Sequence, residues 1–144
     1  MSNRDLRVGA FAIGVFAYVS LAPALADPKG LWRGSDGGMT RISACGAALC
    51  GYLASVSPAI DPSTGRPWTD KNNADPNRRD RPLVGTPVLI GMRPNGSGKW
   101  SGHLYYYVDG RTYSGHLIEQ GPGNIRVEGC VLGMCGGEDL IRIK

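Results

Sequence analysis

The sequence predicts an all-β protein, a single small antiparallel up-and-down barrel of about eight short strands with one long loop. Strand-like runs separated by turn signals recur from residue 30 to residue 144, and the chain has 22 glycines with which to make the turns. After residue 26 no stretch has the periodicity of an amphipathic helix. Closure into a barrel is favoured because it removes exposed strand edges.

Residues 1–26 have the pattern of a signal peptide. Arg4 and Arg7 form a short positive segment, an apolar run covers residues 8–21, and Ala24-Leu25-Ala26 supplies the small residues of a cleavage site. The alternative is an uncleaved membrane anchor, but the apolar run is shorter than the ~20 residues that a spanning helix needs. We therefore expect export to the periplasm or the medium, a mature chain from Asp27, and no later membrane span.

Residues 27–144 have the length of a single domain. The formal net charge of the chain is +4, of which residues 1–26 contribute +1. So mild an excess of positive charge does not indicate nucleic acid as a partner.

In the first part of the domain, strands are expected at 30–33, 39–44 and 50–56. Ser35-Asp36-Gly37-Gly38 predicts a turn between the first two, and the second and third form a hairpin. Further strands are expected at 87–92, 125–131 and 138–144.

Residues 99–119 form the clearest hairpin, because two runs rich in aromatic strand formers meet at Asp109-Gly110. If these two residues alone form the turn, Val108 pairs with Arg111 and His103 lies directly across from His116. A three-residue loop with a glycine bulge would instead put the two histidines on opposite faces. The two-residue turn places an apolar set on one face: Trp100, Leu104, Tyr106, Tyr113 and Leu117.

The two histidines, His103 and His116, are weak candidates for a metal site. Two imidazoles on adjacent strands suit a transition metal, but no third ligand is obviously near them. The run from Asp70 to Asp75 breaks the calcium-loop pattern, since Ala74 and Arg81 occupy positions that need oxygen ligands. We predict neither a metal nor a cofactor.

All four cysteines lie after residue 26, in two identical C-x4-C spacings. In an exported chain they indicate disulfides, and the spacings suggest the local pairs Cys45–Cys50 and Cys130–Cys135. Bridges between the two segments are the alternative. A zinc site is a weaker interpretation, because zinc usually takes C-x2-C pairs.

Residues 57–81 are expected to form the long loop, because four prolines and seven Asp or Asn residues leave no helix or strand periodicity. Its arginines, Arg78, Arg79 and Arg81, are candidates for binding an anionic group. The interleaved Asp75 and Asp80 favour an ordinary solvated loop instead.

The domain resembles the DUF2147 family of exported bacterial proteins of unknown function. The resemblance rests on five stretches: Gly30-Leu31-Trp32, CGAALCG at 45–51, residues 72–85, Trp100-Ser101-Gly102 with 109–113, and Val127-Glu128-Gly129-Cys130 leading to Arg142. It implies a lipocalin-like (calycin-like) barrel and export, and it supplies no catalytic residues.

The function that we expect is binding of a small, largely apolar or anionic ligand, because barrels of about eight strands can hold one such molecule. Enzymatic activity is less expected, since no catalytic set is assembled. The alternative is a cell-envelope interaction module that uses the 57–81 loop and has a solid core. Ligand-contacting residues are expected inside the barrel and at its mouth: Trp32, Trp100, Leu104, Tyr106, Tyr113 and Leu117 inside, and Arg78, Arg79 and Arg81 at the mouth.

Overall fold

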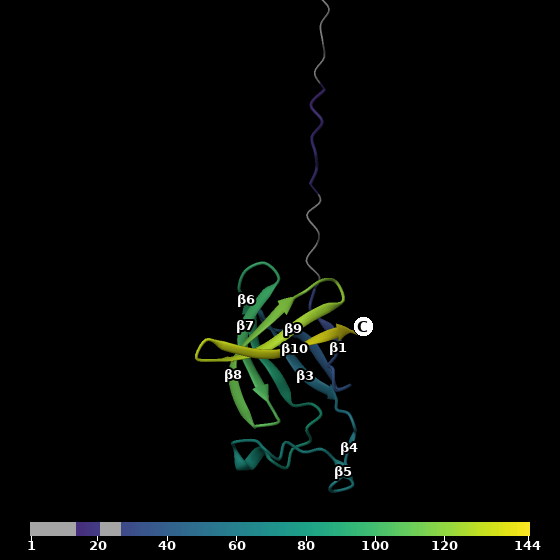
Figure 1. Cartoon of the computed structure of the whole chain (residues 1–144), viewed down its shortest axis with the longest axis vertical. Coiled ribbons are helices and arrows are strands. Elements are labelled where there is room, and N and C mark those ends of the chain that lie inside the picture. The colour runs from purple at the N-terminus through teal and green to yellow at the C-terminus, as the bar shows by residue number, and fades with distance from the viewer. Residues whose placement is uncertain (1–13, 21–26) are drawn as a thin grey trace, which may run out of the picture.

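The structure, a computed structural model, describes residues 14–20 and 27–144. Residues 14–20 have no regular secondary structure and extend away from the barrel (Figure 1). The remainder of the expected signal peptide, residues 1–13 and 21–26, lies outside the described residues. Within the described ranges, no helix has both the length and the apolar character that crossing a membrane would require.

The described part of the chain contains a closed antiparallel barrel of eight strands, which confirms the predicted fold class. Each strand pairs with its neighbours in the sequence, except where a long segment separates β3 from β6, and the first strand closes onto the last. The barrel strands are β1 (Gly30–Arg33), β2 (Met39–Cys45), β3 (Ala48–Ser55), β6 (Pro87–Pro94), β7 (Lys99–Tyr106), β8 (Arg111–Glu119), β9 (Asn124–Val131) and β10 (Met134–Arg142).

The long segment between β3 and β6 has more structure than expected. It contains a two-stranded sheet of β4 (Ile60–Asp61) and β5 (Arg66–Pro67) and the 3₁₀ turn η1 (Pro76–Arg78). Asp75 caps η1, because its carboxylate accepts a hydrogen bond from the backbone N–H of Asn77 at 3.0 Å. The segment lies below the barrel in Figure 1.

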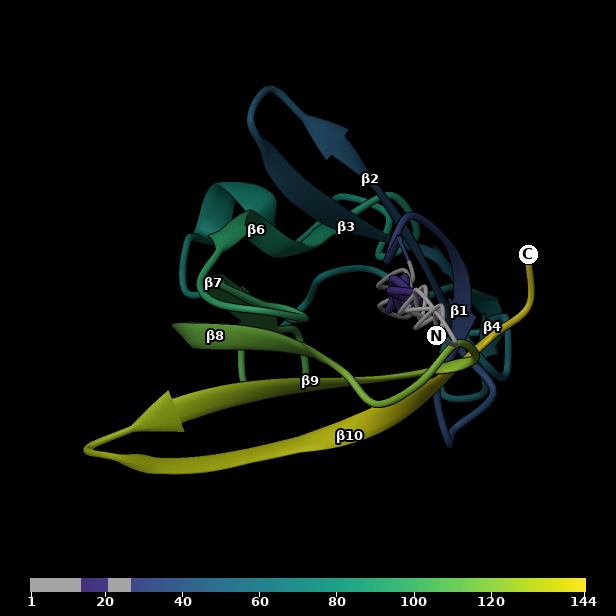
Figure 2. The ribbon, with the colours of Figure 1, turned by 90° about the horizontal axis from the view of Figure 1, so that it is seen from above.

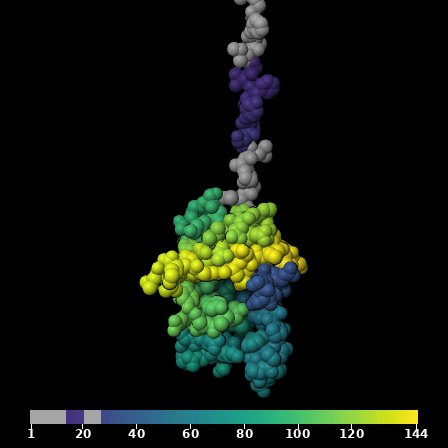
Figure 3. Space-filling model, viewed as in Figure 1, coloured from purple at the N-terminus to yellow at the C-terminus, as the bar shows by residue number. Residues whose placement is uncertain are grey.

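The last strand begins at Met134, four residues earlier than the predicted start at residue 138. Gly136 and Gly137 continue the ladder, opposite Gly129 and Glu128. The turn is made instead by Leu132 and Gly133, both of which have positive φ. The resulting β9–β10 hairpin projects beyond the rest of the barrel, as Figures 2 and 3 show.

The predicted register of the β7–β8 hairpin is wrong by two residues. His103 lies opposite Ser114, and His116 lies opposite Ser101, so the two histidines do not face each other. The loop has four residues, 107–110, and is closed by a hydrogen bond from the N–H of Gly110 to the carbonyl of Tyr106 at 2.9 Å. Because strand side chains alternate with a period of two, this shift leaves every side chain on its predicted face.

The cause of the longer loop lies in the long segment. The Asn72 side chain donates to the carbonyl of Val108 at 2.9 Å, and the N–H of Ala74 donates to the carbonyl of Gly110 at 3.4 Å. Gly110 has φ of 72°, and a Cβ there would overlap the carbonyl oxygen of Asn72. The loop is therefore shaped by a distant segment as well as by its own turn residues.

The two ends of the barrel differ in how they are filled. We call the end with the β2–β3, β6–β7 and β8–β9 turns the closed end, and the end with the long segment and the β1–β2, β7–β8 and β9–β10 turns the open end. The core lies toward the closed end and includes six side chains with at most 2% of their surface exposed: Trp32, Ile42, Leu89, Met92, Leu117 and Ile125.

Candidate functional site: a cavity at the open end of the barrel

A cavity of about 770 Å³ occupies the open end of the barrel. Its inner wall is apolar, and four tyrosines and three carboxylates stand among its lining residues. The apolar lining comes from β3, β6, β7, β9 and β10: Leu53, Val88, Leu89, Leu104, Val127 and Leu140. The barrel is thus solid at one end and hollow at the other.

The cavity reaches the surface where the barrel wall is incomplete. β1 pairs with β10 only through Trp32 and Arg33, whereas β9 pairs with β10 from Met134 onward. The first half of β10 therefore forms one side of an opening, and the β1–β2 turn forms the other, with Gly34 and Glu138 among the lining residues. A four-residue first strand is too short to complete the wall.

Three tyrosines of β7, β8 and the loop between them contribute to the cavity lining. Tyr106 is about half exposed, at 46%, whereas Tyr107 packs against the core cluster. The Tyr113 hydroxyl donates a hydrogen bond to the carboxylate of Asp109. Burial raises the pKa of Tyr107, and the nearby carboxylates of Asp36 and Glu138 raise it further.

Carboxylates line the opening on both sides. The Oε2 atom of Glu138 accepts hydrogen bonds from the N–H of Ser35 at 3.4 Å and from its hydroxyl at 3.2 Å, which links β10 to the β1–β2 turn. Asp36 accepts from the N–H of Gly38 at 2.8 Å. A Cβ built on Gly34 would lie 3.1 Å from Glu138 Oε2 and 3.2 Å from Asp36 Oδ1, so the two carboxylates converge on this glycine.

The long segment is anchored to the outer face of β7 by a buried polar network. Asp70 has a fully buried side chain and accepts a hydrogen bond from the Tyr105 hydroxyl at 2.6 Å. Its other oxygen accepts from Asn73 at 2.8 Å and pairs with the Arg81 guanidinium at 2.7 Å. Burial, and then the hydrogen bond to Asp70, raise the pKa of Tyr105 to about 12.

The three arginines predicted at the mouth lie on the outer side of the barrel instead of lining the cavity. Arg81 pairs with the buried Asp70, and Arg79 donates to the carbonyl of Asn73 at 2.8 Å. Arg78 pairs with Asp75 at 3.4 Å. Arg78 and Arg81 line a separate hollow of about 450 Å³ between the long segment and β8.

The predicted interior residues divide between the two ends of the barrel. Leu104, Tyr106 and Tyr113 line the cavity. Trp32 and Leu117 are fully buried in the core, and Trp100 packs against them half-buried. Trp32 donates its indole N–H to the carbonyl of Pro28 at 2.8 Å, and the Arg142 guanidinium lies over its ring.

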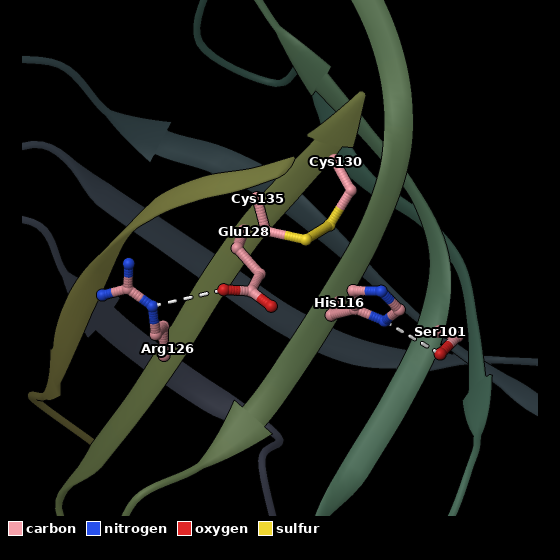
Figure 4. Close-up of a disulfide and its surroundings, with 6 residues drawn as sticks. All are labelled: Ser101, His116, Arg126, Glu128, Cys130 and Cys135. Carbon is pink, nitrogen blue, oxygen red and sulfur yellow. Dashed lines mark hydrogen bonds and ion pairs between the residues drawn. A yellow bond between two sulfur atoms is a disulfide. The ribbon is translucent and has the colours of Figure 1, made fainter. Parts of the chain in front are cut away.

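Both disulfides have the local pairing, Cys45–Cys50 and Cys130–Cys135. Ligand atoms of His116, Cys130 and Cys135 lie within 4.8 Å of one another on the outer face (Figure 4). Disulfide sulfurs are not the thiolates that bind metals, so in this state only the imidazole remains as a ligand. Its Nδ1 is 3.0 Å from the Ser101 hydroxyl.

Sequence reasoning missed Asp36, Glu138 and Tyr107 as site residues. Asp36 was assigned to a turn and Glu138 to the start of a strand. One signal could have found them: in an up-and-down barrel, the turns at 34–38, 107–110 and 132–133 must all lie at the same end. The charged residues within those turns, Asp36 and Asp109, are both acidic.

Comparisons with known proteins agree with this architecture. The family model for DUF2147, described as an uncharacterized protein conserved in bacteria, matches residues 30–142. This chain belongs to the DUF2147 family. A solved structure, protein HP1028 from the human pathogen Helicobacter pylori, is described as belonging to the lipocalin family. It superposes with a TM-score of 0.69 at 18% identity, covering 83% of this chain and 84% of that one, a likeness that bears on the fold alone. No curated protein matches.

Proposed function

We propose that this DUF2147 protein binds a small, largely apolar ligand in the cavity at the open end of its barrel. The observation that carries the proposal is the cavity itself, because about 770 Å³ of partly enclosed, mostly apolar space falls within the usual size of ligand sites. Leu104, Tyr106 and Tyr113 would contact the ligand. The lipocalin-like fold is compatible with this role.

The arginines Arg78, Arg79 and Arg81 suggested an anionic ligand. Each of them is already engaged, with Asp75, Asn73 and Asp70 respectively, and none lines the large cavity. We therefore propose the apolar cavity as the site. The alternative function, an interaction module that uses residues 57–81, assumed a solid barrel core. The hollow open end favours ligand binding over this alternative.

We also propose that the protein acts after export, as a single domain from Asp27 onward. The apolar run and the Ala24-Leu25-Ala26 pattern support cleavage, and two disulfides are consistent with an oxidising compartment. N-terminal sequencing of the protein from a periplasmic or culture-medium fraction tests this. A mature N-terminus at Asp27 supports export, and a full-length chain in the cytoplasm contradicts it.

The ligand proposal is tested by native mass spectrometry of the purified protein and by titration with Nile red, an uncharged apolar dye. Leu104→Trp should narrow the cavity and weaken dye binding. His103→Trp is the matched control, because His103 is the neighbouring residue on the exposed outer face and its enlargement leaves the cavity unchanged. Absence of both a co-purifying ligand and saturable dye binding would overturn the proposal.

A further inference from the structure

We propose that the ligand is an organic cation, a molecule with an apolar body and one amine or quaternary ammonium group, whose charge sits at the opening between Asp36 and Glu138. This inference rests on the proposed ligand-binding function. The first observation is the sign of the charges: among the described residues that line the cavity, the charged ones are Asp36, Asp109 and Glu138, and none is Lys, Arg or His.

This acidic lining runs against the composition of the protein, whose formal net charge is +4. Within residues 14–20 and 27–144, basic side chains form ion pairs with other acids, such as Asp70, Asp75 and Asp139, and with none of the three carboxylates of the cavity. No basic side chain of the described ranges therefore lies within ion-pair distance of these carboxylates.

The two carboxylates nearest the opening are close to each other. Asp36 Oδ1 and Glu138 Oε2 both lie just over 3 Å from the position of a Cβ on Gly34. The two oxygens are thus no farther apart than these two distances added together. Like charges at that range repel, and a cation near both carboxylates reduces the repulsion. Because Gly34 has no side chain, both carboxylates can approach it this closely.

The aromatic lining of the cavity suits a cation as well. Tyr106, Tyr107 and Tyr113 line the same cavity, and a tyrosine ring attracts a cation over its face. Burial, and then the nearby Asp36 and Glu138 carboxylates, raise the pKa of Tyr107, the tyrosine on which these two acids act. A fatty acid would bring its carboxylate into this field and be disfavoured.

A divalent metal fits the opening less well than an organic cation. Among the described residues, three or more His, Cys, Asp or Glu ligands converge only at His116 with Cys130 and Cys135, on the outer face. Two carboxylates beside an apolar cavity with aromatic walls match a large monocation, whose apolar part fills the remaining volume.

The experiment compares three ligands that share one chain and differ in head group: decyltrimethylammonium, 1-decanol and decanoate, each below its aggregation concentration, by Nile red displacement. The cation should bind at least about tenfold more tightly than decanol, a ratio that one exposed ion pair and one cation–π contact together supply. Decanoate should bind most weakly. The preference should shrink as salt is added.

Two variants test which carboxylates cause the preference for the cation. Asp36→Asn with Glu138→Gln keeps the hydrogen-bond acceptors for Gly38 and Ser35 and should abolish the preference for the cation while decanol binding persists. Asp139→Asn is the control, because it removes a charge one residue away but outside the cavity, where Asp139 pairs with Arg126. It should retain most of the preference.

The outcomes separate the two proposals. If decanol binds and the cation has no advantage, or if the Asp36–Glu138 double variant keeps the full preference, the inference is wrong and the ligand-binding function stands. If none of the three ligands and no dye binds to correctly folded protein, the ligand-binding function fails and the inference falls with it.

Discussion

The closed and open ends of this barrel are built from the same strands. They differ in how completely the inward-facing side chains fill the interior. At the closed end, Trp32, Met92 and Leu117 fill the interior completely. At the open end, the strands surround a cavity. One continuous sheet can thus enclose tightly packed side chains at one end and a cavity at the other.

The open end also differs between its inner and outer sides. The cavity side carries carboxylates, whereas the long segment outside carries the arginines and is held by the buried Asp70, Tyr105 and Asn73. This network fastens the segment against β7 without occupying the cavity. Substitutions in the core, in this network and at the cavity should therefore affect stability and ligand binding to different extents.

The largest expected loss of stability comes from a substitution in the core at the closed end. Leu117→Ala removes a fully buried side chain and should lower the free energy of unfolding by about 4 kcal/mol. Leu104→Ala, on the wall of an existing cavity, should cost only about 1 kcal/mol, because part of its surface is not packed. Urea unfolding monitored by tryptophan fluorescence measures both. Equal losses would contradict the division into a filled end and a hollow end.

The next largest loss of stability is expected from the buried network around Asp70 that anchors the long segment. Asp70→Ala leaves Tyr105 and Arg81 without their buried partner and should cost about 3 kcal/mol. Asp75→Ala, in an exposed ion pair with Arg78, should cost no more than about 1 kcal/mol, including the lost cap of η1. Thermal unfolding followed by circular dichroism compares them. A small effect of Asp70→Ala would mean that the segment is not fastened through this network.

A pH effect should follow from Tyr105. The fold raises its pKa from 10.0 to about 12, so between these values the folded protein keeps a proton that the unfolded chain loses. Stability from this group is therefore complete below pH 10 and falls by roughly 2–3 kcal/mol as the pH rises through 12. Denaturant unfolding at pH 9 and pH 11.5 measures it.

Tyr105→Phe is the control for that measurement, because it removes the titrating hydroxyl and keeps the ring. The stability difference between wild type and the phenylalanine variant should shrink at alkaline pH. A constant difference from pH 9 to pH 11.5 would show that Tyr105 does not titrate in this way.

The smallest effects are expected from the disulfides. Each closes a short loop, so replacing either pair by serines should cost about 2 kcal/mol in the chain-entropy model. The two pairs lie at opposite ends of the barrel, and only loss of Cys130–Cys135, beside the cavity, should also alter Nile red binding. Binding unchanged in that variant would show that the β9–β10 hairpin does not shape the site.

Much of the fold was predictable because its signals are local. The order of the strands, the hairpin over 99–119, the faces of Leu104 and Tyr113 and the local disulfides all follow from alternation, turn residues and spacing. The start of β10 was misplaced because Gly136 and Gly137 look like turn residues, yet lie in the ladder. The local sequence around a pair of glycines does not show whether they form a turn or continue a strand.

The sequence by itself determined the class of the fold, the order of the strands and the faces of the 99–119 hairpin, because these depend on a period of two and on turns a few residues long. Only the tertiary structure decided three things: the four-residue loop at Asp109-Gly110, the hollow open end, and the convergence of Asp36 and Glu138 on Gly34. Each depends on residues that are far apart in the chain and meet only in the folded protein. No single segment therefore determines the volume of the cavity or the charge around it.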